Sequence, residues 1–208
     1  VVKQFEQEIC EYVGAKYAAS FFSASYALYT IMKSEVCRTP WIKKVIDIPS
    51  MIPPVVPNVI VDAGYGISFN DDIDWVGDGL VDSAQKLNRN QYAEECDPDD
   101  LLVFSMYPTK PLSSLDGGVV VSNNKKKIDD LKSLSFYGME YAEESWSRVQ
   151  KQVGFKAYMS TMQATIASRN IKTLDSKYER IDEIRNKYNS EFGLENTSRH
   201  LYRIELQD

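Results

Sequence analysis

The stretch LLVFSMYPTKPLSSLDGG, residues 101–118, decides how the chain is interpreted. It opens as a short apolar run, residues 101–104, of the kind that forms a buried strand. It then breaks at Ser105 into an irregular segment in which two prolines bracket Lys110. Because each proline fixes its own φ angle, the lysine between them has a restricted position. Two interpretations are open: an ordinary solvated lysine in a surface loop, or an amine held in a cleft to form a Schiff base.

The composition is that of an ordinary soluble globular protein, with 208 residues, of which 43% are hydrophobic and 26% charged. A net charge of −6 argues against a nucleic-acid binder, which normally carries a basic face. No apolar run is long enough to cross a membrane and no signal peptide opens the chain, so a cytoplasmic location is expected. The three cysteines are far apart, which indicates free thiols, and no Cys/His cluster has the spacing of a zinc site.

Short apolar strands alternate with helices along the chain. This pattern predicts a three-layer α/β domain with a mostly parallel sheet flanked by helices. Strands are expected over residues 17–22, 45–48, 67–69, 80–81, 101–104, 118–122 and 200–206. Helices are expected over residues 2–13, 26–32 and 127–134, and a long amphipathic helix over about 158–192.

Two further expectations concern the organisation of the chain. Four prolines between residues 49 and 57 argue against a regular long helix there. The large domain is expected to comprise residues 1–192, and residues 193–208 are expected to be the start or remnant of a small C-terminal domain. The chain has one histidine, His200, so chemistry that depends on a central histidine base is not expected unless His200 supplies it.

Polar residues follow three of the predicted strands at the point where each ends: residues 23–25, 82–85 and 105–110. Ligands of such sheets bind outside the carboxyl ends of the strands. The serine turn precedes a helix, so it is either a helix cap, an anion cradle of free backbone N–H groups, or both. An anion cradle, the carboxylate of Asp82 and the amine of Lys110 suit the phosphate, ring nitrogen and aldehyde of pyridoxal phosphate.

Four blocks of the sequence, in order along the chain, match those of a known family. They are FEQEICEYVGAKYAASFFSASYAL (5–28), VDSAQKL (81–87), FSMYPTKPLSSLDGGVVVS (104–122) and VGFKAYMSTMQATIA (153–167). Together they resemble the DegT/DnrJ/EryC1/StrS family of pyridoxal-phosphate-dependent sugar aminotransferases. The resemblance implies the fold-type-I architecture of the large domain of aspartate aminotransferase.

The resemblance also implies roles for individual residues. Lys110 would be the Schiff-base lysine and the acid/base of the reaction. Asp82 would pair with the protonated ring nitrogen of pyridoxal phosphate, and Gln85 would contact the ring face or its 3′ oxygen. The phosphate would bind to the hydroxyls of Ser25 and Ser105 and to the backbone N–H of Ala24. Considered singly, Asp82 is equally well a turn or capping carboxylate, and Ser105 a strand-end hydroxyl.

The implied function is transfer of an amino group, from glutamate or a similar donor, to a nucleotide-linked keto sugar by a homodimer. The alternative is a shortened, catalytically weak or inactive relative that binds pyridoxal phosphate or a partner without transamination. Departures from the family pattern motivate this alternative, and the first is that the chain is shorter than family members and ends where their small C-terminal domain would begin. The proline-rich residues 49–57 stand where the family carries a ring-stacking aromatic, and Lys156 and Tyr158 stand where the family has Asn and Arg that reach across the dimer interface. A dehydratase of the same fold would carry a histidine at the position of Lys110.

Overall fold

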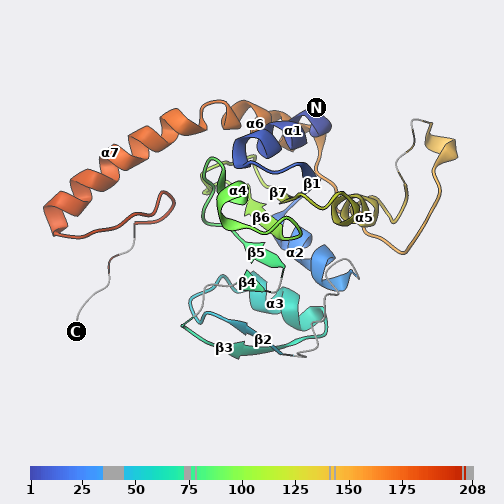
Figure 1. The fold of residues 1–208 in the computed structure, drawn as a ribbon, viewed down its shortest axis with the longest axis horizontal. Coiled ribbons are helices and arrows are strands. Elements are labelled where there is room, and N and C mark those ends of the chain that lie inside the picture. The colour runs from blue at the N-terminus through green and yellow to red at the C-terminus, as the bar shows by residue number, and fades with distance from the viewer. Residues whose placement is uncertain are drawn as a thin grey trace.

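The structure of the chain, a computed structural model, describes residues 1–34, 45–72, 76–77, 79–140, 142, 144–202 and 204. Within these residues the central element is a five-stranded sheet in the order β1-β7-β6-β5-β4 (Figure 1). Its strands are β1 (Tyr17–Phe21), β4 (Val76–Gly77), β5 (Leu80–Asp82), β6 (Leu101–Ser105) and β7 (Gly118–Ser122). A separate two-stranded sheet pairs β2 (Val45–Ile48) in parallel with β3 (Gly66–Phe69).

Three strands of the main sheet share one direction. β5 pairs in parallel with β6, and both β1 and β6 pair antiparallel with β7, so β1, β5 and β6 end at the same edge. β7 runs the opposite way because residues 106–117, which connect it to β6, contain no helix that would carry the chain back across the sheet. The short strand β4 also runs antiparallel to its neighbour β5. The predicted α/β class is confirmed, but the prediction of a mostly parallel sheet is wrong. Among the described strands of the main sheet, β5 and β6 form the parallel pair and the other three pairs are antiparallel.

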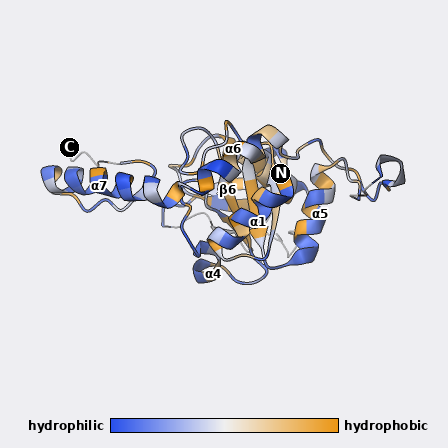
Figure 2. Cartoon of the chain, turned by 90° about the horizontal axis from the view of Figure 1, so that it is seen from above, coloured by the Kyte–Doolittle hydropathy of each residue, from blue (hydrophilic) through white to orange (hydrophobic). Residues whose placement is uncertain are grey.

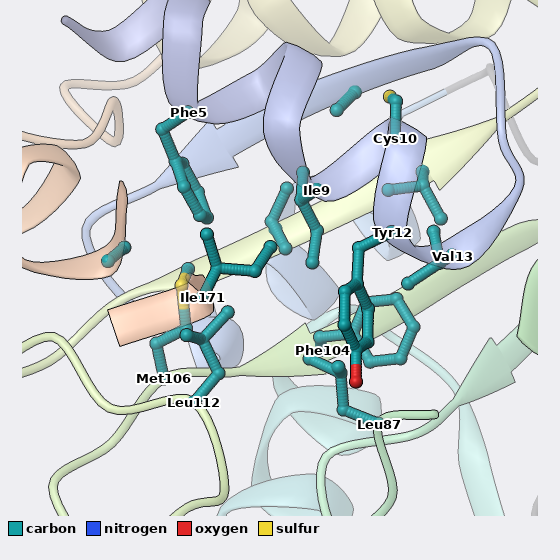
Figure 3. Packing of buried hydrophobic residues seen from close by; sticks show 14 of the residues in the cluster. Phe5, Ile9, Cys10, Tyr12, Val13, Leu87, Phe104, Met106, Leu112 and Ile171 are labelled. Atoms are coloured by element: carbon teal, nitrogen blue, oxygen red, sulfur yellow. The ribbon is translucent and has the colours of Figure 1, made fainter. Parts of the chain in front are cut away.

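Helices cover both faces of the sheet, which gives the predicted three layers. One core cluster joins helix α1 (Val2–Val13) and helix α6 (Thr161–Ile171) to one face of β6, through Leu102 and Phe104. A second cluster joins α2 (Ala24–Lys33), α3 (Val55–Asp62) and α5 (Lys125–Ser135) to the other face, through Leu101 and Val103. Figure 3 shows the first cluster at close range, and Figure 2 shows the apolar sheet lying between helices with hydrophilic outer surfaces.

The predicted helix boundaries are set by local caps. Helix α1 ends where Gly14 takes a left-handed conformation with φ 78°. Helix α2 begins at Ala24, two residues before the predicted start, because the hydroxyl of Ser23 accepts a hydrogen bond from the N–H of Tyr26 at 3.3 Å. The serine turn is therefore a helix cap.

A helix of eight residues, α3, begins within the proline-rich segment, where the four prolines argued against a long helix. Pro54 precedes its first turn and Pro57 is its third residue. The first four N–H groups of a helix have no partner within it, so proline is tolerated there. A short helix, α4 (Gln91–Glu95), also lies in a stretch that carries no periodic pattern.

The C-terminal part differs from the prediction of one helix over residues 158–192. Ser160 forms a capping box with Gln163, which starts α6 at Thr161, and a new helix, α7 (Leu174–Phe192), follows it after a break. α7 extends away from the sheet, and only Leu174 and Tyr178 of this helix are buried (Figures 1 and 2). Residues 200–202 are irregular, not a strand, and residues 203 and 205–208 lie outside the described part.

The division of the chain at residue 192 into a large domain and a C-terminal remnant stays a prediction.

Cys10 and Cys96 are free thiols. Burial raises the pKa of Cys10 to about 12 and that of Cys96 to about 11, and Cys37 lies outside the described residues. None of the described helices is both long enough and apolar enough to cross a membrane.

Candidate functional site

The carboxyl ends of β1 and β6 and the start of β7 form one row at the edge of the sheet. Gly118 of β7 pairs with Phe21 on one side and with Ser105 on the other. Asp82, the last residue of β5, pairs with Val103 on the neighbouring strand. A cavity of about 710 Å³ opens at this edge. All six residues predicted for the site line it: Ala24, Ser25, Asp82, Gln85, Ser105 and Lys110.

Asp82 is held by its own turn. Its Oδ1 accepts a hydrogen bond from the N–H of Ala84 at 2.9 Å. Burial raises the pKa of the Asp82 carboxyl, while the bond from Ala84 and the charge of Lys110 act in the opposite direction. The carboxylate is therefore fixed in direction and interacts electrostatically with the lysine across the cavity.

The loop that carries Lys110 is anchored on both sides. The backbone N–H of Lys110 donates to the carbonyl of Tyr107 at 2.9 Å, and the Nζ of Lys177, on α7, donates to the carbonyl of Pro111 at 2.7 Å. Asn170, on α6, donates to the carbonyl of Ser113 at 2.8 Å. These bonds position the lysine on a rigid support, as the flanking prolines predicted. Burial lowers the pKa of the partly buried Lys110 amine, and Asp82 counteracts this shift.

The first turn of α2 approaches the start of β7 closely. A Cβ added to Gly118 would lie 2.5 Å from both the N and the Cα of Ala24. Only glycine fits there, which accounts for the second glycine of the quoted stretch. The N–H groups of Ala24 and Ser25 belong to the first turn and lack partners within the helix. These N–H groups line the cavity at the position where the sequence predicts an anion cradle.

The opposite wall of the cavity is aliphatic. It consists of side chains from the proline-rich segment and the start of α3: Pro49, Met51, Ile52, Pro53, Val55 and Val56. This segment stands where the family resemblance implies a ring-stacking aromatic residue.

Two further lining residues were missed by the sequence analysis. Tyr107 and Asp116 lie in the same loop as Lys110 and face the cavity. The backbone carbonyl of Asp116 accepts a hydrogen bond from the side chain of Gln163, on α6, at 3.1 Å, so this residue also braces the loop. Both residues lie between the end of β6 and the glycine pair at residues 117–118, and this position could have marked them as site residues. Their residue types alone do not indicate a role.

The structure also places the two residues that depart from the family pattern. Tyr158 bridges to Phe21 of β1 and packs against Phe136, with 5.4 Å between ring centroids, and against Tyr137 at 6.1 Å. Lys156 bridges to Phe136 and has an exposed side chain. Neither residue lines the 710 Å³ cavity of this chain.

The family model described as the DegT/DnrJ/EryC1/StrS aminotransferase family matches residues 81–201, more than half of the chain. The chain belongs to this family. The resemblance stated from the sequence is thus confirmed, and the matched region includes Asp82, Gln85, Ser105 and Lys110.

Two curated relatives of the family are UDP-4-amino-4,6-dideoxy-N-acetyl-beta-L-altrosamine transaminases of Campylobacter jejuni. They are 25% identical over 262 residues and 28% identical over 258 residues, and each match covers 99% of this chain. The chain spans 68% of the length of these two relatives.

Solved structures of the family share the fold at low sequence identity. Helicobacter pylori PseC, an aminotransferase involved in the biosynthesis of pseudoaminic acid, has a TM-score of 0.73 at 19% identity, covering 96% of this chain and 67% of that chain. A putative PLP-dependent aminotransferase from Bacillus cereus has a TM-score of 0.74 at 18% identity, covering 93% and 64%.

Aminotransferases of the DegT/DnrJ/EryC1/StrS family use pyridoxal phosphate. The donor set of this cavity fits that group in three places. The N–H groups at the start of α2 suit a phosphate, the partly buried carboxylate of Asp82 suits a protonated ring nitrogen, and the amine of Lys110 suits an aldehyde. Among the described residues, the aliphatic wall contains no aromatic side chain, and the aromatic residue that lines the cavity is Tyr107, in the loop of Lys110.

Proposed function

We propose that this chain binds pyridoxal phosphate in the 710 Å³ cavity and transfers an amino group to a nucleotide-linked keto sugar. One observation carries the proposal: the anion cradle of α2, the carboxylate of Asp82 and the amine of Lys110 line the same cavity. The family membership and the names of the curated relatives support the sugar substrate.

Each residue of the cavity has its own role in the proposed reaction. Lys110 is the Schiff-base lysine, and its Nζ holds and moves the proton at the reacting carbon. Asp82 would keep the ring nitrogen protonated, since a partly buried carboxylate favours a positively charged partner. Ser25, Ser105 and the N–H of Ala24 orient the phosphate, and Gln85 contacts the ring. Pyridoxal phosphate, when bound, supplies an electron sink for the amine substrate.

A second candidate function is binding of pyridoxal phosphate without transamination. The observation that favours it is the aliphatic wall, because a cofactor ring that met no aromatic side chain on that wall would be held less firmly in the cavity. In this case the lysine, the carboxylate and the anion cradle still bind the cofactor, but the substrate amine is not aligned for reaction.

The proposal extends to a homodimer. The segment around the short helix η2 (Ser145–Ser147) projects from the body of the chain (Figure 1). Its large apolar side chains are solvent-exposed, with Trp146 and Val153 each 84% exposed. An exposed apolar arm of this kind is typical of an interaction surface, and sedimentation velocity of the purified chain, with and without Trp146→Ser, tests whether it joins two copies.

One spectroscopic titration tests both functions. Pyridoxal phosphate added to the purified chain is expected to give a visible absorbance band, and borohydride is expected to fix the cofactor to Lys110. Glutamate, the proposed donor, is then expected to convert the band to that of the amine form of the cofactor, and a keto sugar nucleotide to restore it. A band that forms but resists every amino donor favours binding alone, and a chain that takes up no cofactor contradicts both functions.

A further inference from the structure

We propose that His200 is the proton acceptor for the amine of Lys110, so that the C-terminal segment supplies a general base to the candidate site. The inference rests on the proposed function, in which Lys110 acts as a nucleophile. The chain has one histidine, and the structure brings it from ninety positions along the sequence to the reactive lysine.

The contact is direct. The Nζ of Lys110 lies 3.3 Å from the Nε2 of His200. An ammonium group has three donors and no acceptor, so Nε2 must be the acceptor while Lys110 is charged. Both side chains are partly exposed, which leaves a route from the imidazole to solvent.

The backbone around His200 is fixed by the segment that carries it. The Oγ of Ser198 accepts hydrogen bonds from the N–H of His200 at 3.2 Å and of Leu201 at 3.3 Å. This small turn fixes the backbone from which the imidazole extends.

Helix α7 holds the same segment in place. Arg199 binds Asp182 through two hydrogen bonds, at 3.0 and 2.6 Å, and its guanidinium lies 4.7 Å from the ring centre of Tyr178. The hydroxyl of Tyr202 donates to Asn189 at 2.7 Å. Because Lys177 of the same helix binds the loop of Lys110, one rigid element positions both partners of the contact.

Other ionisable groups line the same cavity as Lys110 or bind its loop, but an imidazole suits the role of proton acceptor best. Asp82 from β5 and Asp116 from its own loop line the cavity, as does Tyr107, and Lys177 binds the next residue of the loop. A carboxylate is a weak base and a phenol is protonated at neutral pH, whereas an imidazole gains and loses its proton near neutral pH. Burial lowers the pKa of Lys110, which brings the amine closer to the imidazole in proton affinity.

The proposed step balances in protons and electrons. The ammonium of Lys110 gives one proton from Nζ to Nε2 of His200, and the neutral amine keeps the electron pair. That pair forms the N–C bond to a carbonyl carbon, and the carbonyl oxygen leaves as water with the two protons of the amine. The imidazolium then returns its proton to solvent.

The experiment uses the full chain, freed of cofactor, in wild-type, His200→Gln and His200→Ala forms. The first readout is the rate at which acetic anhydride labels Lys110 between pH 6 and 10, measured by peptide mass spectrometry, with exposed Lys86 as the reference in the same digest. The second readout is the rate at which added pyridoxal phosphate is captured. Thermal unfolding of each variant checks that the fold is retained.

His200→Gln keeps a hydrogen-bond acceptor but cannot take the proton. It is expected to slow both rates by about 100-fold near pH 7.5, the low end of what a positioned general base contributes. The rise of the wild-type rate through neutral pH is expected to vanish, and added imidazole is expected to restore much of the rate in His200→Ala. Labelling of Lys86 is expected to stay constant.

The outcomes separate this inference from the proposed function. If His200→Gln is labelled at the wild-type rate, or if imidazole fails to rescue His200→Ala, the base role of His200 is contradicted even when cofactor capture proceeds. If labelling of Lys110 depends on His200 but no pyridoxal phosphate is captured by the wild type, the proposed function fails and the base role stands.

Discussion

The two walls of the cavity differ in origin and in chemistry. One wall consists of strand ends and the loop after β6, and it carries the polar groups Asp82, Ser105 and Lys110. The other consists of the proline-rich segment and α3, and it is aliphatic. Groups that bind a phosphate or hold a proton require a fixed direction, which the hydrogen-bonded edge of a sheet supplies. A wall that supplies only shape tolerates a short helix with prolines in its first turn.

The largest effect is expected at the lysine of the polar wall. Lys110→Ala removes the amine that forms the Schiff base, so the visible band and the borohydride-stable adduct should both be lost completely. Absorbance spectroscopy and intact-mass measurement check this outcome. Lys86→Ala, which removes an exposed lysine four positions after Asp82, is the matched control and should keep both signals. A band of wild-type strength in Lys110→Ala would place the reactive amine elsewhere.

The second prediction concerns the cradle beneath the polar wall. Gly118→Ala places a Cβ 2.5 Å from the N and Cα of Ala24, so the first turn of α2 must move away from β7. Overpacking of this kind costs about 1–3 kcal/mol of the free energy of unfolding. Urea unfolding and an inorganic phosphate titration measure the two consequences, a lower midpoint and weaker anion binding. Unchanged phosphate affinity would show that the anion site is not at this helix start.

The third prediction is that Asp82→Asn raises the stability of the cofactor-free chain but weakens its binding of the cofactor. Burial raises the folded-state pKa of this carboxyl, so its ionised form costs stability once the pH exceeds the unfolded-state value. Asp82→Asn keeps the acceptor for the N–H of Ala84 and removes the charge. The cofactor-free variant should therefore unfold at a higher temperature than the wild type at neutral pH. The difference should shrink as the pH falls and the wild-type carboxyl becomes protonated.

The same substitution should weaken the binding of pyridoxal phosphate, because the ring nitrogen loses its charged partner. Thermal unfolding at two pH values, with and without cofactor, measures both effects on one sample. If the cofactor-free variant is less stable than the wild type at neutral pH, the ionised Asp82 does not cost the folded state stability and this account of Asp82 is wrong.

The smallest effect is expected on the aliphatic wall. Met51→Phe places an aromatic ring beside the cavity, and an aromatic pair adds about 0.5–1.5 kcal/mol, so the affinity for pyridoxal phosphate should rise roughly two- to tenfold. Equilibrium dialysis measures the change. Met162→Phe, at an exposed methionine on α6, is the control and should leave the affinity unchanged. If Met51→Phe binds no better, the ring of the cofactor does not face this wall.

The sequence predicted the polar wall better than the aliphatic one, for a physical reason. Asp82, Ser105 and Lys110 follow apolar runs, and the ends of parallel strands meet at one edge, so local pattern was enough to place them together. The position of α3 depends on packing against α2, which no local pattern encodes. The break between α6 and α7 was missed because both helices continue the same apolar spacing.

The contact between Lys110 and His200 also could not be predicted from the sequence. It depends on a segment that turns back along α7 after Gly193, whose left-handed φ of 64° ends the helix. The bonds that hold this segment join residues near the end of the chain to Asp182 and Asn189. Side-chain pairs of this kind are set by tertiary packing, and the types of the residues involved are common on any helix surface.

The most direct test of the central claim is the location of trapped cofactor in the wild-type chain. The purified protein is incubated with equimolar pyridoxal phosphate, reduced with borohydride, digested and mapped by mass spectrometry. A single modified lysine at Lys110 is the predicted result, since only this amine shares a cavity with the anion cradle and Asp82 among the described residues. Modification that is absent, or spread over exposed lysines such as Lys86 and Lys151, would contradict it.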